Sequence, residues 1–336
     1  MDYKDILNKQ GNKLRRDLNW WPSFLYHFTD VHNASSILDQ GWIYSREQVE
    51  KQNIMRHDNA SRAVIDATNV ESKSYGRLYF RPLTPTQFHN EGYKPEEVRE
   101  KEINASCPVP IFLCLTASDI LEYEGTKFAE RGISGKRNDV QTGIEAFSEL
   151  NFDKIYHEGP LRPEEKDIIE YRHSEVIHEG GFPVNPFLRC ILCRTQAERE
   201  TLLYLLQRYS LRLYNTYKDK VLYKPTLKCF YNNGIFLKYV SVKEGKLYIE
   251  FNDPEQRIKV YQNEIELEIN IELLYKKFDG RILKYDNVAG IINYCKSRSG
   301  EVILRKNLDY DILGIKVKID QAVMYENEII VGDELF

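Results

Sequence analysis

Glu175 is the residue of this chain whose position most needs a chemical explanation. It lies in Arg-His-Ser-Glu-Val-Ile-His, residues 172–178, at the start of a short apolar run. If this run is a β-strand, Glu175 and Ile177 point to one face and Val176 to the other. A carboxylate on a buried strand face costs free energy unless it has a partner or a chemical task. We therefore take Glu175 as a candidate catalytic group, with an ion pair to nearby Arg172 as the alternative.

A second segment also places polar side chains on a predicted strand. In Tyr-His-Phe-Thr-Asp, residues 26–30, the alternation puts His27 and Thr29 on one face. Two strands with inward polar side chains, far apart in sequence, are typical of a cleft between two sheets. A histidine that is satisfied within the core is the alternative for His27. Together with Glu175, these residues predict a binding cleft.

Several familiar catalytic motifs are absent from the sequence. It contains no Gly-x-x-x-x-Gly-Lys phosphate loop, no Gly-x-Gly-x-x-Gly fingerprint, no Gly-x-Ser-x-Gly elbow and no His-Glu-x-x-His pair. Cys190 and Cys193 form one Cys-x-x-Cys, but a zinc site would need a second ligand pair of similar spacing. We interpret both cysteines as buried thiols and predict no metal site.

The composition is that of an ordinary folded chain with room for two domains. The chain has 336 residues, of which 42% are hydrophobic and 29% charged. Its net charge is -4, so a contact with nucleic acid would depend on local positive charge. No apolar run is long enough to cross a bilayer, and the N-terminus lacks the apolar core of a signal peptide. We expect a cytoplasmic protein with no membrane partner.

Local signals predict the elements that would position these residues. Asn33 and Gly41 are good cap residues for a short helix between them, and Thr195 opens a capping box. The polar stretch 125–172 is long for a loop in a compact domain, which is typical of a functional segment. The predicted elements are helices over residues 4–18, 33–41 and 195–217, and strands over 25–28, 77–81 and 108–115, the last buried on both faces.

The pattern changes to strict alternation after about residue 221. This alternation predicts short strands bounded by Gly, Asn and Asp, which are typical of a β-rich domain. We therefore predict a catalytic domain over residues 1–218 and a β-rich domain of unknown role over residues 219–336. The clearest predicted strands are 246–251, 264–271 and 314–319.

Four segments, in the same order along the chain, resemble the DarT family. They are residues 25–33, 57–61, 77–92 and 172–177. DarT proteins are toxins of bacterial toxin–antitoxin systems, linked to phage defence, that ADP-ribosylate bases of single-stranded DNA. The Arg-Leu-Tyr-Phe-Arg-Pro sequence at 77–82 and the additional C-terminal domain are similar to the branch that modifies guanine. The thymine branch more often has Pro-Phe-Tyr-Phe at that strand.

The resemblance implies an α+β fold and a set of site residues. The fold is an ADP-ribosyltransferase core of two small sheets with helices, which clamps NAD as co-substrate, plus the C-terminal β-rich domain. Glu175 matches the catalytic glutamate, and Arg56, Arg62 and Arg77 are candidates for the arginine that assists it. The residues implied to bind NAD are His27, Thr29, Asn33, Arg77 and Tyr79. Those predicted to bind DNA are Arg81, Gln87, His89, Asn90, Arg131, Lys136, Arg137 and Arg172, with a solvated loop as the alternative for 87–91.

The chemistry of ADP-ribose transfer suits these residue types. Breaking the nicotinamide–ribose bond develops positive charge on the sugar, as in glycoside cleavage. A carboxylate beside the ribose stabilises that charge and can take a proton from a base nitrogen. An arginine can hold the pyrophosphate through paired hydrogen bonds. The target base cannot be reached inside a duplex, so a single strand is required.

Other functions stay open at this point. A transferase of the same fold could act on RNA or protein, and an inactive relative could only bind nucleic acid. The presence of Glu175 argues against the inactive relative. The resemblance also implies a cognate antitoxin, DarG in the family, whose macrodomain removes the modification. The target base, the role of the C-terminal domain and the oligomeric state are not given by the sequence.

Overall fold

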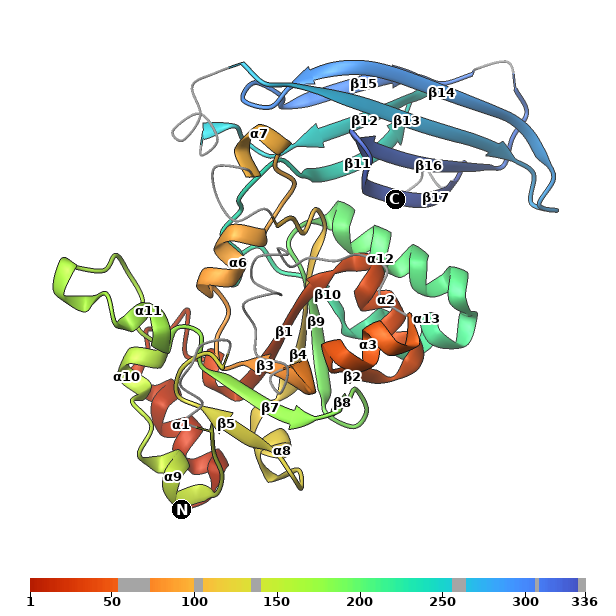
Figure 1. The fold of residues 1–336 in the computed structure, drawn as a ribbon. Helices are drawn as coiled ribbons and strands as arrows, with labels where there is room; N and C mark the ends of the chain where they lie inside the picture. Colours follow the sequence, from red (N-terminus) through yellow and green to blue (C-terminus); the bar gives the residue numbers. More distant parts are fainter. Residues whose placement is uncertain (54–72, 100–104, 134–139, 256–263, 306–307, 332–336) are drawn as a thin grey trace.

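The computed structural model describes residues 1–53, 73–99, 105–133, 140–255, 264–305 and 308–331 (Figure 1). Four predicted site residues, Arg56, Arg62, Lys136 and Arg137, lie outside the described residues, as does the segment 57–61. The other predicted site residues are all described. Among the described residues, no helix is long and apolar enough to cross a membrane.

An eight-stranded sheet forms the centre of the N-terminal two-thirds of the molecule. Its strand order is β10-β9-β4-β1-β3-β7-β5-β6. The strands are β1 (Phe24–Asp30), β3 (Tyr75–Tyr79), β4 (Pro110–Thr116), β5 (Lys127–Ala129), β6 (Val140–Gln141), β7 (Glu175–Glu179), β9 (Leu188–Cys193) and β10 (Val221–Tyr223). β2 (Trp42–Tyr44) and β8 (Gly181–Pro183) pair as a separate ribbon.

A narrow seam between β1 and β3 divides this sheet into two four-stranded halves. β1 pairs with β3 at one position, Tyr26↔Tyr79, whereas it pairs with β4 along its whole length. The mixture of helices and sheets that we predicted is confirmed. The two small sheets that we expected are instead one hydrogen-bonded sheet, because the Tyr26↔Tyr79 pair joins its halves. The halves diverge on both sides of that pair.

Strand β4 shows why the sheet has two cores. The apolar run predicted to be buried on both faces is buried from Pro110 to Leu115. Ile111, Leu113 and Leu115 pack into the largest apolar cluster, which α1 (Tyr3–Lys13) and α12 (Gln196–Tyr209) also line. Phe112 and Cys114 face a second, smaller cluster around Tyr26. A continuous apolar strand therefore serves both faces, as expected for a strand inside a sheet.

The predicted helices form, with different ends. The first ends at Lys13, five residues before the predicted Leu18. α2 (Val31–Gln40) is capped by Asp30, whose side chain accepts the His32 N–H, so Asn33 lies inside the helix. Gly41 has φ +70° and ends α2 as predicted. The helix from Thr195 is interrupted at Ser210, which caps α13 (Leu211–Tyr217).

Short helices connect the strands of the N-terminal region. Their bounds are α3 (Arg46–Gln52), α6 (Pro85–Asn90), α7 (Glu96–Arg99), α8 (Ala117–Glu122), α9 (Ile144–Ser148), α10 (Phe152–Ile155) and α11 (Ile168–Tyr171), with 3-10 turns at Trp21–Ser23, Pro163–Glu165 and Lys218–Lys220. In Figure 1, α9, α10 and α11 lie near α1 and β7. The long polar segment 125–172 therefore contains helices and two strands, and it leads directly into β7.

The C-terminal region contains two further sheets around their own core. One has the order β11-β12-β15 and the other β14-β13-β16-β17. Alternating residues, such as Leu267, Ile269 and Ile271, pack into a separate apolar cluster. The additional β-rich region that we predicted is confirmed. Its strands are β11 (Leu237–Lys243), β12 (Lys246–Phe251), β13 (Glu266–Lys276), β14 (Ile282–Asn293), β15 (Ser299–Ile303), β16 (Ile312–Ile319) and β17 (Ala322–Ile330).

A division into two domains stays our proposal, with a shifted boundary. β10 pairs in parallel with β9, so it belongs to the N-terminal sheet although it follows residue 218. We therefore place the proposed boundary after Tyr223 instead of at 218/219. α12 packs against β17, where Tyr325 donates to Glu200 at 2.9 Å and the Glu326 N–H donates to Thr201 at 3.2 Å.

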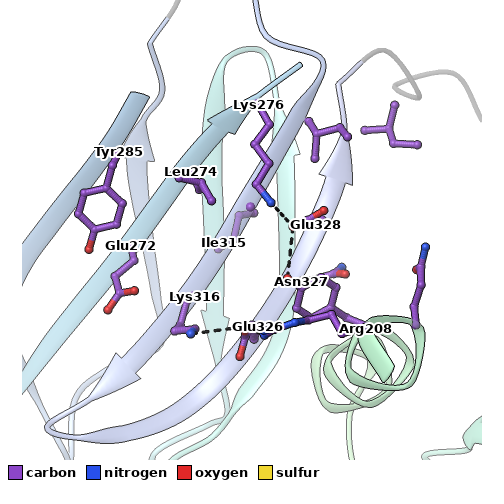
Figure 2. A pocket seen from close by; sticks show the side chains of 15 residues that line it. Arg208, Glu272, Leu274, Lys276, Tyr285, Ile315, Lys316, Glu326, Asn327 and Glu328 are labelled. Atoms are coloured by element: carbon purple, nitrogen blue, oxygen red, sulfur yellow. Dashed lines mark hydrogen bonds and ion pairs between the residues drawn. The ribbon is translucent and has the colours of Figure 1, made fainter. Parts of the chain in front are cut away.

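A cavity of about 590 Å³, lined by both apolar and charged side chains, lies between α12 and the strands β13, β16 and β17 (Figure 2). Its charged side chains pair with one another: Lys316 and Arg208 reach Glu326 at 3.3 and 2.8 Å, and Lys276 reaches Glu328 at 2.5 Å. The lining contains none of the predicted site residues. We interpret this cavity as part of the contact between the two regions.

Candidate functional site

Three neighbouring strands bring the predicted site residues to the seam of the sheet. β3 lies between β1 and β7, so Tyr79 is opposite Tyr26 on one side and Glu175 on the other. Residues directly opposite each other in an antiparallel pair point to the same face. Tyr26, Tyr79 and Glu175 therefore form one row of side chains across the seam, whereas His27, the next residue on β1, points to the other face of that strand.

Glu175 is buried at the start of β7, as the sequence pattern predicted, with 2% of its surface exposed. Its Oε2 lies 3.8 Å from Nη1 of Arg77 and accepts a long hydrogen bond, 3.5 Å, from the backbone N–H of Ile133. Burial raises the pKa of Glu175, while Arg77 and the Ile133 N–H act in the opposite direction. A buried carboxylate with weak partners is a good proton acceptor and a strong local negative charge.

His27 is connected to Glu175 through Arg77. Its Nδ1 lies 3.3 Å from the backbone carbonyl oxygen of Arg77, whose guanidinium approaches Glu175. A carbonyl oxygen can only accept, so Nδ1 carries the proton in this contact and Nε2 is left as an acceptor. Burial lowers the pKa of His27 to about 4, which keeps the ring neutral at physiological pH. A neutral imidazole suits a binding role better than an electrostatic one.

The other residues predicted to bind NAD lie on β3, β1 and α2. Burial, with a contribution from the charge of Glu175, raises the pKa of Tyr79 to about 12, so its phenol stays protonated. Thr29 is buried on β1, and Asn33 is half-buried on α2. The carboxylate of Asp30 fixes the junction between them, since it accepts the N–H groups of His32 and Val109. The junction is therefore rigid where a ligand would meet it.

Among the described residues, Arg77 is the arginine whose side chain approaches Glu175. It lies on β3 two residues before Tyr79, so both side chains point to one face, and this strand runs two residues earlier than the predicted 77–81. Arg56 and Arg62 lie outside the described residues. The structure therefore brings one of the three candidate arginines to Glu175 and gives no position for the other two.

Three residues predicted to contact DNA are buried instead, and these predictions need correction. The Arg81 guanidinium donates to the carbonyl oxygens of Pro82 at 3.0 Å, Ile155 at 3.2 Å and His157, and lies over the Trp21 ring. The segment after Pro82, for which a solvated loop was the alternative, forms α6 with Gln87 and Asn90 buried. In this structure the side chains of Arg81 and Gln87 donate to groups of the protein itself, and Asn90 is buried.

The remaining described candidates for DNA binding are more exposed. Arg131 donates to Glu170 at 2.8 Å and lies over the Tyr171 ring. Arg172 donates through Nη2 to the carbonyl oxygen of Gly159 at 2.7 Å and contacts His157 Nδ1 at 2.9 Å. His89 is half-buried near the end of α6. Thr86, on the same helix as His89, contacts His173, the residue after Arg172, at 3.4 Å.

Sequence reasoning did not single out Ser174, the neighbour of Glu175. Its hydroxyl is buried and donates to the carbonyl oxygens of Glu130 and Tyr171, the latter at 2.6 Å. This contact holds the segment before Ile133, whose N–H reaches Glu175, against β7. No motif marks such a role, because a serine before a glutamate is a common pair. The contact depends on a partner 44 residues away.

No metal site is evident in the part of the chain that the structure describes. Within that part, no group of three or more His, Cys, Asp or Glu side chains could hold a metal ion. All six cysteines are free thiols. Cys190 lies opposite Cys114 on neighbouring strands, and Cys193 is buried on β9. Burial raises the pKa of Cys193 and Cys114 well above the usual value, as expected for inert core thiols.

Comparison with protein families identifies residues 26–224 with the model described as "DarT: ssDNA thymidine ADP-ribosyltransferase, DarT". This match spans more than half of the chain, includes His27, Arg77 and Glu175, and ends next to β10. No curated protein matches the chain.

Solved structures of DarT proteins resemble the N-terminal region. They include Thermus sp. 2.9 DarT in complex with NAD+, at 16% identity and TM-score 0.48, covering 62% of this chain and 98% of that one. The same protein in complex with ADP-ribosylated ssDNA has 16% identity and TM-score 0.49, with 62% and 97% covered. Thermosipho africanus DarTG in complex with ADP-ribose has 14% identity and TM-score 0.46, with 63% and 52% covered.

Proposed function

This chain belongs to the DarT family of single-stranded-DNA ADP-ribosyltransferases, and we propose that it transfers ADP-ribose from NAD to guanine in single-stranded DNA. The observation that carries the proposal is the buried Glu175 beside Arg77 at the seam of the sheet, next to His27. An ion pair kept for stability would be short and saturated with hydrogen bonds. Within the described part of the chain, the contacts of the Glu175 carboxylate are long, at 3.8 and 3.5 Å.

The proposed reaction exchanges one bond at the ribose carbon C1′. The bond from C1′ to nicotinamide breaks and its electron pair leaves with nicotinamide. Positive charge then develops on the sugar, and the negative charge of Glu175 stabilises it. A nitrogen of the DNA base forms the new bond to C1′. The proton that this nitrogen loses goes to Glu175, whose raised pKa makes it a better base than an exposed carboxylate.

The proposed NAD site follows from residues on both sides of the seam. His27, Thr29 and Asn33 would bind the adenosine half, since His27 offers an unprotonated Nε2 and Asn33 is partly exposed. Arg77 would hold the pyrophosphate, and Tyr79 would donate from a phenol that stays protonated. Arg56 and Arg62 stay candidates for a second arginine.

The choice of guanine rests on two features of this chain. One is the Arg-Leu-Tyr-Phe-Arg-Pro sequence at 77–82, and the other is the C-terminal β-rich region. The matching family model carries thymidine in its description, so thymine is the rival target. His89, Arg131 and Arg172 are the described candidates for contacts to the strand, and Lys136 and Arg137 stay candidates from the sequence.

We further propose that the protein is the toxin of a toxin–antitoxin system that acts on DNA in the cytoplasm. The antitoxin would be a macrodomain protein that removes ADP-ribose, like DarG in the family. The name DarTG of the Thermosipho africanus structure motivates this part of the proposal. Co-expression with such a macrodomain should restore growth to cells that express the active chain, and failure to do so would contradict this part.

Mass spectrometry of short single strands after incubation with NAD tests the reaction and the base. Strands that contain guanine should gain the mass of one ADP-ribose, and thymine-only strands should not. A gain of this mass on thymine-only strands would support the proposed reaction and contradict guanine as the target base. If DNA gains nothing while an RNA or protein acceptor does, the same fold acts on another substrate. If no acceptor is modified, the chain is a binding protein.

A further inference from the structure

An aromatic side chain lies exposed next to the candidate site. Phe88 on α6 keeps 45% of its surface exposed. The centroid of its ring lies 5.4 Å from that of the His89 ring and 5.2 Å from that of the Tyr231 ring, and both contacts are edge-to-face. Because 45% of the side chain stays exposed, part of the Phe88 ring remains accessible to a ligand. An exposed phenylalanine that is held by two other rings offers a flat, apolar surface in a fixed orientation.

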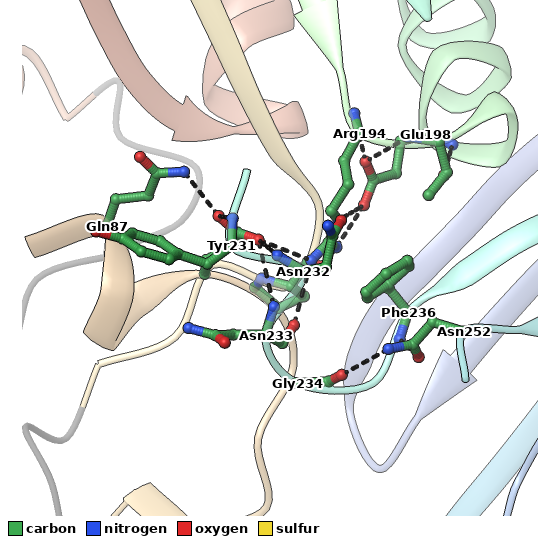
Figure 3. Close-up of polar contacts among 12 residues, drawn as sticks. Gln87, Arg194, Glu198, Tyr231, Asn232, Asn233, Gly234, Phe236 and Asn252 are labelled. Atoms are coloured by element: carbon green, nitrogen blue, oxygen red, sulfur yellow. Dashed lines mark hydrogen bonds and ion pairs between the residues drawn. The ribbon is translucent and has the colours of Figure 1, made fainter. Parts of the chain in front are cut away.

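Tyr231 comes from the segment that leads into the C-terminal region, and buried contacts fix it. Glu91 accepts the backbone N–H groups of residues 231–233 at 2.9, 2.6 and 3.4 Å. The Tyr231 hydroxyl donates to the carbonyl oxygen of Leu83 at 2.6 Å. Gln87 donates to Glu91 and to the carbonyl oxygen of Cys229, each at 2.7 Å (Figure 3). Both ends of this aromatic pair are therefore anchored to α6.

α6 also connects the aromatic pair to the strand of Glu175. Thr86 contacts His173, two residues before Glu175, at 3.4 Å. Arg172 is half-buried next to Tyr231, and its charge lowers the pKa of that tyrosine against the effect of burial. The carboxylate of Glu158 acts on the charge of Arg172, and among the described residues the buried Nε of Arg172 has no hydrogen-bond partner. A positive charge thus lies near Tyr231, the ring that supports Phe88.

We propose that Phe88, supported by Tyr231, stacks on a nucleobase of single-stranded DNA next to the base that receives ADP-ribose, while Arg172 faces the phosphate between them. This inference rests on the proposed function, because it names a second contact for the same substrate. Aromatic stacking with an adjacent cation is how proteins hold single strands without reading their sequence. Tyr231 lies outside the matched residues 26–224, so the segment leading to the C-terminal region completes the surface.

Binding of fluorescein-labelled single strands, measured by anisotropy without NAD, tests the platform. Phe88→Ala should weaken binding about tenfold, the effect expected from the loss of one stacked base. Phe88→Trp should bind at least as tightly as the wild type. The control Phe278→Ala removes an equally apolar ring, 68% exposed, from the turn after β13, and should bind like the wild type. NAD hydrolysis without DNA should be equal in all four proteins and reports their folding.

Strands with one abasic position beside the target base separate stacking from a structural effect. For the position that stacks on Phe88, wild type and Phe88→Ala should bind the abasic strand equally weakly. The proposed stacking is wrong if Phe88→Ala binds intact strands like the wild type. It is also wrong if the substitution weakens the binding of every abasic strand as much as that of the intact strand. Transfer by the wild type is a separate readout. Its absence would overturn the proposed function, and the anisotropy would still decide on the platform.

Discussion

Two buried carboxylate sites in this molecule are built in opposite ways. Glu91 is fully buried and receives five donors: Gln87, the N–H groups of residues 231–233, and the Arg194 guanidinium at 3.6 Å. Glu198 lies beside it with four short contacts from Arg194 and Thr195. Glu175 is almost as buried, yet its contacts among the described residues are a cation at 3.8 Å and one N–H at 3.5 Å.

The difference in the number and length of these contacts indicates a different role for each site. A buried charge with saturated, short hydrogen bonds repays the cost of desolvation and fixes the local structure. A buried charge with long contacts recovers only part of the free energy of desolvation. It therefore retains the capacity to bind a proton or stabilise a cation. We infer that the Glu91–Arg194–Glu198 group joins the two regions, whereas Glu175 is held for chemistry.

Removing Glu91 should have the largest effect on stability. Glu91→Ala leaves three backbone N–H groups without their side-chain acceptor and removes one of the two carboxylates beside Arg194, so the free energy of unfolding should fall by about 3–5 kcal/mol. Urea unfolding measures it. Glu250→Ala is the control, because the Glu250–Lys238 pair is exposed on β12 and its loss should cost less than about 1 kcal/mol. Equal losses in both variants would contradict the comparison.

Removing the cation beside Glu175 should slow transfer and shift its pH dependence. Arg77 opposes the rise in the pKa of Glu175, so Arg77→Ala should raise that pKa further. The carboxylate is the reactive form, and activity falls as pH drops through its pKa. The acid limb of the transfer rate should therefore move to higher pH, with a loss at neutral pH of about 10–100-fold. If the acid limb of the pH–rate profile stays where it is in the wild type, Arg77 does not influence the pKa of Glu175.

The smallest effect is expected at His27. Its pKa of about 4 is below the ordinary value of 6.5, so the ring stays neutral through the range in which an exposed histidine titrates. NAD affinity should change less than about twofold between pH 8 and pH 5.5 through this residue. The contribution of His27 to folding stability is complete above pH 6.5 and is lost as pH falls toward 4. Calorimetric titration of NAD with wild type and His27→Gln, at both pH values, checks the binding claim. A wild-type affinity that weakens around pH 6.5 would contradict it.

The sequence predicted the Glu175 site better than the Glu91 site, for a physical reason. An acid at the start of an apolar run is a local pattern, and the structure confirms that Glu175 is buried on a strand. The acceptor role of Glu91 depends on N–H groups about 140 residues away, which no local pattern contains. Arg81 failed as a prediction in the same way, because the carbonyl groups that bury it belong to residues 155 and 157.

The alternation of apolar and polar residues predicted the strands of the C-terminal region, and the capping residues predicted the helix ends to within a turn or two. The alternation after residue 221 predicted strands that the structure contains at 246–251 and 312–319. Asp30 caps α2 three residues before the predicted Asn33, since the carboxylate also accepts the Val109 N–H. We predicted one helix to Tyr217 and missed the end of α12 at Tyr209. The next residue, Ser210, caps the start of α13. Boundaries depend on such contacts, whereas the existence of an element depends on its pattern.

Single-turnover transfer by Glu175→Gln tests the central claim most directly. The amide keeps the shape of the side chain, so the variant should bind NAD and unfold at no lower urea concentration than the wild type. It cannot accept a proton or stabilise the developing charge, so adduct formation on a guanine-containing strand should fall at least about a thousandfold. Adduct formation at the wild-type rate would show that Glu175 is another structural carboxylate.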